Sequence, residues 1–440
     1  MMIAKILSRI CKPALFLSQI ILILALGCSP NETTITVLTA TSSPMPAAIQ
    51  PQSTETQIPT TAQTLTPFVP RAVVKIVSHV PLSGNQAAYG QDILHGVELA
   101  VQQLSGPLNA LSYKVELVTY DDQNITETAL KNAQQLVADP EILCGIGHYD
   151  SDITIAASDI YHQAGLAFIS PSTTDPILTG RSFLEVDRLI GRTDGQGSAA
   201  AIFVKAQGYK SFFIVSPKSD SNLINAESFR AEAGKLGIKR LGSIISNLTP
   251  ENMDGFVRLV MSVKPDVVYI ATPAHQAIPF LTKLRAAGYT GAFLGTEKLG
   301  NQSMIGAAGP SLVAGDGMFY TIMNPSADYY SDASQFNQDF YDQYGTAPLS
   351  FAARAYDATG ICLKAIEEAS KANSSTAPTR AEVAEAIREV QDYKGITGTY
   401  SFNSHGDPDP MQYYVYQVVS TDINSWDKNP IVAAYQITPP

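Results

Sequence analysis

The sequence predicts an α/β fold with two doubly wound parallel-sheet lobes joined by a three-segment hinge. Strand and helix patterns alternate from the first folded residue, which is typical of strand-helix-strand units. The folded part of the 440-residue chain has about 370 residues, more than one hydrophobic core usually serves. A late group of helices follows the second alternating series, so we expect the chain to return to the first lobe.

The first lobe is expected to begin at residue 71. Its strands are predicted at 73–80, 113–120, an apolar run ending at Gly147, and 166–169, and its helices at 89–104, at 125–138 and after Asp152. In the second lobe the predicted strands are 212–215, 244–245, 267–270 and 293–295, and the predicted helices are 194–206, 226–236, 253–263 and 276–287.

The third part of the chain carries a strand at 318–322 and helices at 333–344, 351–370 and 380–390. We expect it to complete the first lobe and to cross back near Gly395, with a hairpin of 399–402 and 413–419 on the second lobe. The expected domains are 71–191 plus 321–395, and 192–320 plus 396–440. Three crossings form a hinge, and two lobes that close on a ligand are a known switching mode.

The N-terminus reads as a secretion signal over residues 1–27. Lys5, Arg9 and Lys12 precede an apolar run of about 13 residues, which suits a signal-peptide core better than a membrane span. The run ends in Leu-Ala-Leu-Gly before Cys28, which resembles the bacterial lipobox that directs lipid attachment to the cysteine. An uncleaved anchor is the alternative. Both place the rest of the chain outside the cytoplasm, held to the membrane.

Residues 28–70 are predicted to form a disordered tether behind the lipidated cysteine. Of the 42 residues from 29 to 70, 22 are Ser, Thr or Pro, and none is Lys or Arg. Such a segment cannot bury enough apolar surface to offset the entropy of ordering it.

The net charge of the chain argues against one class of partner, and the two cysteines of the folded part could be free or bridged. The formal charge of −11 becomes −14 once the signal is removed, which argues against nucleic acid as a partner. Cys144 and Cys362 lie in apolar surroundings, and we expect buried free thiols rather than a bridge.

Two hydroxyl-rich loops follow neighbouring strands of the first lobe. Ser151 lies in the first loop, and Ser172 and Thr174 lie in the second. Loops at the carboxyl ends of parallel strands collect hydroxyls and free helix N–H groups in one crevice. The pattern favours a small anionic or zwitterionic ligand. The alternative is that Ser151 and Thr174 merely cap helices.

An ordered set of short motifs resembles the leucine/isoleucine/valine-binding proteins of bacterial ABC transporters, in their lipoprotein form. The similarity runs in register from about residue 74 to residue 419 and implies a type 1 periplasmic-binding-protein fold. It rests on 81–84 (Pro-Leu-Ser-Gly), 89–90 (Tyr-Gly), 120–122 (Tyr-Asp-Asp), 147–148 (Gly-His), 157–161 (Ala-Ser-Asp-Ile-Tyr), 169–172 (Ile-Ser-Pro-Ser), 195–197 (Gly-Gln-Gly), 294–297 (Leu-Gly-Thr-Glu), 300–301 (Gly-Asn), 398–402 (Gly-Thr-Tyr-Ser-Phe) and 406–407 (Gly-Asp).

The resemblance implies a binding site for a small amino acid of the branched-chain type or a related one. By position, Ser151 would hold the ligand's carboxylate, and Ser172 and Thr174 its carboxylate and amino group. Glu297 would pair with the ligand's ammonium, and Tyr89 would form a pocket wall. The resemblance further implies a monomer without cofactor or metal, and membrane permease subunits as partners.

The chain departs from the family pattern on the second-lobe side of the site. Ser221 and Asn222 stand where the family has a Tyr-Gly pair, an aromatic position falls near Pro273, and the family's bridging cysteines fall at Asn124 and Asp150. These changes remove apolar wall from the site. Asp150 and its neighbour Asp152 add negative charge, which favours an amide or a cationic ligand.

Two other classes of function are weighed against a solute-binding protein. An enzyme is disfavoured because no metal-binding histidine spacing, nucleophile elbow or phosphate loop occurs. His148 beside Ser151 suggests a base and nucleophile, but no orienting acid or oxyanion donors accompany them. An autonomous receptor is not expected, because no transmembrane helix or cytoplasmic domain follows Pro440. A lipid-tethered sensor for an amide, urea or another amino-acid-like solute remains the alternative.

Overall fold

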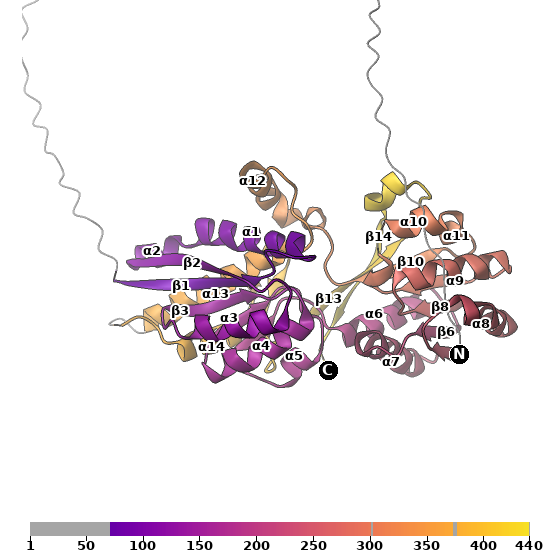
Figure 1. Ribbon diagram of the computed structural model, residues 1–440, viewed down its shortest axis with the longest axis horizontal. Coiled ribbons are helices and arrows are strands. Elements are labelled where there is room, and N and C mark those ends of the chain that lie inside the picture. The colour runs from indigo at the N-terminus through magenta and orange to yellow at the C-terminus, as the bar shows by residue number, and fades with distance from the viewer. Residues whose placement is uncertain (1–70, 301, 373–375, 440) are drawn as a thin grey trace, which may run out of the picture. The chain divides into compact units, whose positions relative to one another are not determined.

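The computed structural model describes residues 71–300, 302–372 and 376–439 (Figure 1). The predicted signal segment, the lipidated Cys28 and the predicted tether lie outside the described residues. Within the described part of the chain, none of the helices combines the length and the apolar character needed to span a bilayer.

The first lobe is built on a parallel sheet with strand order β2-β1-β3-β4-β5. Alternate strand residues supply two cores, since Ile76 faces one core and Val77 faces the other. The strands are β1 (Ala72–Val80), β2 (Tyr113–Asp121), β3 (Ile142–Gly147), β4 (Ala167–Ser170) and β5 (Val186–Arg188). The helices from this part of the chain are α1 (Ala87–Leu104), α2 (Gly106–Ala110), α3 (Thr126–Val137), α4 (Ser151–Gln163) and α5 (Ile177–Gly180).

The second lobe is built on a mixed sheet with strand order β14-β13-β10-β9-β8-β6-β7. Five strands are parallel, and β13 and β14 are antiparallel additions at one edge. The strands are β6 (Ser211–Ser216), β7 (Lys239–Ile245), β8 (Val267–Ile270), β9 (Ala292–Gly295), β10 (Met318–Ile322), β13 (Met411–Gln417) and β14 (Ile431–Ile437). The helices are α6 (Thr193–Ala206), α7 (Asp220–Lys235), α8 (Pro250–Val263), α9 (Ala274–Ala286), α10 (Ser303–Ala308) and α11 (Pro310–Val313), with short 3₁₀ turns η1 (Glu297–Leu299) and η4 (Ile423–Lys428).

The late helices of the chain pack into the core of the first lobe. Ile361 and Ile366 of α13 and Ile387 of α14 lie in the same core as Ile76 of β1. These segments are η2 (Ala327–Tyr329), η3 (Ser331–Ala333), α12 (Ser334–Tyr344), α13 (Ala352–Ala372), α14 (Arg380–Arg388), β11 (Tyr393–Lys394) and β12 (Thr399–Tyr400). The chain therefore crosses from one lobe to the other three times.

The predicted hairpin of 399–402 with 413–419 is wrong. β12 pairs with β11, and Tyr400 and Phe402 are buried in the first-lobe core, because their aromatic rings find apolar surface there. The hairpin partner of β13 is instead β14, which the sequence reading missed. The third crossing consequently follows Phe402 rather than Gly395.

The expectation of two free thiols is also wrong, because Cys144 of β3 and Cys362 of α13 form a disulfide with a Cα–Cα distance of 6.1 Å. The two residues are 218 positions apart in the chain. They meet because α13 packs on the face of the first sheet to which Cys144 points. Sequence spacing alone carries no sign of that packing.

We predict that the double substitution Cys144→Ala with Cys362→Ala lowers the free energy of unfolding by about 2–5 kcal/mol, because the bridge closes a long loop of the unfolded chain. Urea denaturation followed by circular dichroism measures the change. A reductant should destabilise the wild type and leave the double variant unaffected. Equal stability of the wild type with and without reductant would contradict the bridge.

Candidate ligand-binding site

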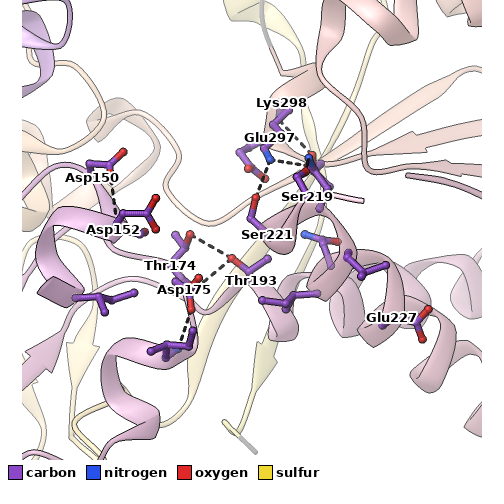
Figure 2. Close-up of a pocket in the computed structure, with 18 of the residues that line it drawn as sticks. Asp150, Asp152, Thr174, Asp175, Thr193, Ser219, Ser221, Glu227, Glu297 and Lys298 are labelled. Atoms are coloured by element: carbon purple, nitrogen blue, oxygen red, sulfur yellow. Dashed lines mark hydrogen bonds between the residues drawn. The ribbon is translucent and has the colours of Figure 1, made fainter. Parts of the chain in front are cut away.

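A cavity of about 970 Å³ is lined by residues of both lobes (Figure 2). The first lobe contributes the loops after β3 and β4, at the carboxyl ends of these strands. The second lobe contributes the first turns of α7 and the turn η1 that follows β9. The cavity therefore lies where the open parallel sheets of the two lobes present their loop ends.

Three of the five predicted binding residues line this cavity: Ser151, Thr174 and Glu297. Ser172 and Tyr89 do not. The Ser172 hydroxyl donates to the carbonyl oxygen of His148 at 2.7 Å, so it ties the first loop to the second. The Tyr89 ring stacks on another aromatic ring of the first lobe and is partly exposed. The ligand-binding roles of the three lining residues stay a prediction.

The alternative that Ser151 and Thr174 merely cap helices is wrong. Asp150 is the N-cap of α4, and its carboxylate accepts the backbone N–H of Asp152 at 2.9 Å. Asp175 accepts the N–H of Ile177 at the start of α5. Ser151 and Thr174 therefore line the cavity without capping a helix, and Ser151 is the first residue of α4.

Thr193, the first residue of α6, joins the second of these loops. Its backbone N–H donates to the carbonyl oxygen of Thr174 at 2.9 Å, and its hydroxyl lies 3.2 Å from the Thr174 hydroxyl. Figure 2 shows the two threonine side chains facing each other on the cavity wall. The lining thus continues from the first lobe into the first helix of the second.

His148 faces away from Ser151 and into a buried polar cluster. Its two ring nitrogens lie 2.6 Å from the Asp122 carboxylate and 2.9 Å from the Tyr161 hydroxyl. His79 contacts the same hydroxyl, and burial lowers the pKa of its imidazole well below the usual value. His79, Asp122 and His148 are metal-ligand types within 4.8 Å of one another in the described structure. Both ring nitrogens of His148 have partners within this cluster, so His148 provides no base for Ser151.

A chain of side-chain hydrogen bonds leads to Glu297. Gln196 of α6 donates its amide N–H to Glu297 Oε2 at 2.7 Å and to the carbonyl oxygen of Thr321 at 3.1 Å. Asn225 of α7 donates to the Gln196 amide oxygen at 2.6 Å and accepts from the Tyr269 hydroxyl.

The direction of this chain is fixed where it meets a backbone carbonyl. The carbonyl oxygen of Thr321 can only accept, so Gln196 must turn its NH₂ group to Thr321 and to Glu297. The Gln196 oxygen then faces the NH₂ group of Asn225, and the Asn225 oxygen accepts from the Tyr269 phenol.

Lys298 follows Glu297 directly and reaches across to the start of α7. Its ammonium donates to Asn222 Oδ1 at 2.6 Å and lies 3.1 Å from the Ser221 hydroxyl (Figure 2). Burial lowers the pKa of the Lys298 ammonium, and the nearby Glu297 opposes that shift.

Sequence reasoning assigned no role to Lys298, Gln196, Asn225 or Thr193. The sequence did contain an indication that Lys298 lies at the site, because it is adjacent to Glu297, the one acid assigned to the site. It contained no such indication for Asn225, because the helix was expected to begin at residue 226, whereas α7 begins at Asp220.

Several other carboxylates line the cavity, and most of them pair with an arginine or accept a backbone hydrogen bond. Asp159 pairs with Arg181 at 2.8 Å, and Glu227 pairs with Arg230 at 2.6 Å. Asp150 and Asp175 accept backbone N–H groups at helix starts, as described above. These pairings weaken the case for a cationic ligand that the sequence had suggested.

These features define a two-lobed binding protein with its cavity at the carboxyl ends of both sheets. A profile described as periplasmic binding protein matches residues 73–422, and the chain belongs to this family. Its members are solute-binding proteins of ABC transporters rather than enzymes, which removes the enzyme alternative.

Named relatives cover most of the chain. The chain is 26% identical over 339 residues to a Leu/Ile/Val-binding protein homolog 2 of Brucella abortus, covering 77% of this chain and 88% of the relative. It is 26% identical over 347 residues to a leucine-, isoleucine-, valine-, threonine- and alanine-binding protein of Pseudomonas aeruginosa, covering 78% and 89%.

Solved structures share the fold. A leucine-binding protein of Thermotoga maritima aligns with a TM-score of 0.64 at 23% identity, covering 83% of this chain and 99% of that one. An isoleucine complex of a branched-chain amino-acid-binding protein from Streptococcus pneumoniae aligns with a TM-score of 0.61 at 20% identity, covering 83% and 100%. The predicted type 1 periplasmic-binding-protein fold is confirmed.

We predict that Gln196→Leu lowers the free energy of unfolding by about 1–3 kcal/mol, because Asn225 and Glu297 lose a buried hydrogen-bond partner. Urea denaturation of the variant and the wild type gives the difference. Gln207→Leu is the matched control, since Gln207 is exposed at the end of the same helix and should change little. Equal effects of the two substitutions would show that the chain of hydrogen bonds contributes nothing specific.

Proposed function

We propose that this protein is the extracytoplasmic solute-binding component of an ABC importer, and that it binds a small α-amino acid between its lobes. Relatives named for leucine, isoleucine and valine suggest a branched-chain or related ligand. The observation that carries the proposal is the pairing of unlike groups in one cavity. Hydroxyls line it from the first lobe, and the Glu297 carboxylate lines it from the second.

This pairing suits a zwitterion for a physical reason. Each charge taken out of water loses several kcal/mol of hydration unless fitted partners meet it. The ligand's carboxylate would accept hydrogen bonds from Ser151 and Thr174 at the N-terminus of α4, where the helix dipole favours negative charge. The ligand's ammonium would lie against Glu297.

Binding would close the lobes about the three connecting segments. Arg354 of α13 donates to the carbonyl oxygens of Leu189 and Met323, which lie on the first and second connections. Asp407, just before the third connection, pairs with Arg192 of the first connection at 3.1 Å. Because the connections are cross-linked to one another, we expect them to bend together as one hinge.

The N-terminal region would hold the protein at the membrane. A lipid on Cys28 would anchor it, and the 42 residues from 29 to 70 would link that anchor to the folded part. The closed form could then meet permease subunits in the same membrane.

We predict that Glu297→Gln weakens binding of an α-amino acid by about 2–5 kcal/mol, because the ligand's ammonium loses its charged partner. A thermal-shift screen of the wild type over amino acids first identifies a ligand, since a ligand that binds the folded form raises the melting temperature. Calorimetric titration then measures the loss.

Glu251→Gln provides the control for this experiment. Glu251 is an exposed carboxylate of the second lobe outside the cavity, so its substitution should leave affinity unchanged. Unchanged affinity in Glu297→Gln would remove Glu297 from the site. Failure of every α-amino acid to stabilise the wild type would overturn the proposed function itself.

A further inference from the structure

We propose that Asp407 is a positioning residue that couples the loop around Thr174 to the hinge, so that a ligand held by this loop drives closure of the lobes. The inference rests on the proposed function and names the residue through which binding reaches the connections. Asp407 does not line the cavity, and its side chain is fully buried. Its role therefore depends on the groups that its carboxylate contacts.

One oxygen of this carboxylate faces Arg188, which holds the loop around Thr174. Arg188 Nε lies 2.9 Å from Asp407 Oδ1. The two terminal nitrogens of the same guanidinium donate to the carbonyl oxygens of Thr173 at 2.8 Å and Asp175 at 2.9 Å. These carbonyl groups lie on either side of Thr174, which lines the cavity (Figure 2). The position of Thr174 thus depends on a guanidinium that Asp407 anchors.

The other oxygen of the carboxylate faces the first connection between the lobes. Arg192 Nη1 donates to Asp407 Oδ2 at 3.1 Å. The Arg192 guanidinium also pairs with Asp194, in the first turn of α6, at 2.6 Å. Asp407 itself lies just before the third connection. A single carboxylate therefore contacts the residue that holds the loop and the residue that leads into the first helix of the second lobe.

The network around Asp407 is suited to transmit a displacement. Arg188 is fully buried, and burial lowers the pKa of its guanidinium, whereas the charge of Asp407 opposes that shift. A buried cation that loses its partner is strongly unfavourable, so the two groups move together. Closely packed interiors transmit strain because their side chains have few alternative positions. We therefore expect a shift of the Thr174 loop to reach the first and the third connection.

The test is calorimetric titration of the full-length wild type and its variants with leucine, isoleucine, valine, threonine and alanine. Asp407→Asn keeps the shape of the side chain and removes its charge. We expect this variant to bind the tightest of the five amino acids at least about 10-fold more weakly than the wild type, as the loss of coupling between two sites does. Small-angle scattering should show that saturating ligand compacts the variant less than the wild type.

Asp187→Asn is the matched control. Asp187 lies on the same strand as Arg188, is fully buried and pairs with Arg388 at 3.0 Å. The other partners of Arg388 are backbone carbonyls of residues outside the cavity. Burial raises the pKa of Asp187 to about 7, so titrations at pH 8 keep its carboxylate ionised. We expect this variant to lose stability and to keep the affinity of the wild type.

Arg192→Lys is a second variant that cuts the same link at the first connection. It keeps the positive charge but replaces the planar fork that contacts Asp407 and Asp194 at once. This variant should also bind more weakly, although Arg188 keeps its partner. The fitted number of sites reports the folded fraction and the dissociation constant reports the coupling, so partial unfolding cannot mimic the effect.

The outcomes separate this inference from the function on which it rests. Equal affinity of the wild type and Asp407→Asn, or equal losses of affinity in Asp407→Asn and Asp187→Asn, would overturn the inference and leave amino-acid binding intact. If Asp407→Asn does not fold, unchanged affinity in Arg192→Lys overturns it. Failure of all five amino acids to bind the wild type would overturn the proposed function, and the inference with it.

Discussion

A zwitterion can leave water only if a donor-rich surface meets its negative end and an anion meets its positive end. This constraint accounts for the placement of the cavity. Parallel sheets present loops and helix N-termini at their carboxyl ends, and two such sheets supply the two kinds of surface from opposite sides. Ser151 and Thr174 come from one lobe and Glu297 from the other.

Each side of the cavity is supported by hydrogen bonds of polar groups at its wall and behind it. On the first lobe, Asp150 caps α4 and leaves Ser151 at the wall, while Ser172 ties the two loops together. On the second lobe, a directed chain of hydrogen bonds runs from Tyr269 to Glu297. A preformed site loses less entropy when it binds, so these supports favour affinity without touching the ligand.

Sequence reasoning recovered those parts of the fold and site that depend on local pattern. The apolar strands and the hydroxyl-rich loops after them are contiguous in the chain, so Ser151 and Thr174 could be assigned to one crevice. Glu297 was identified as the acid that follows a strand of the second lobe. The strand 267–270 was predicted with the bounds that β8 has in the structure.

The features that were missed depend on contacts between distant segments. The bridge of Cys144 to Cys362 requires α13 to pack on the first sheet. The pairing of β13 with β14 escaped notice because the half-buried edge strand shows a weak pattern. The contacts of Lys298 with Ser221 and Asn222 depend on where α7 lies in the folded protein, so the sequence could not predict them. Contacts between such distant segments are seen only in the folded structure.

The most direct test of the account is a crystal structure of the protein grown with the amino acid that stabilises it most. The account predicts one ligand molecule in the cavity, with its ammonium within hydrogen-bond distance of Glu297 and its α-carboxylate against Ser151 and Thr174. Density for the ligand elsewhere, or a ligand held by one lobe alone, would contradict it.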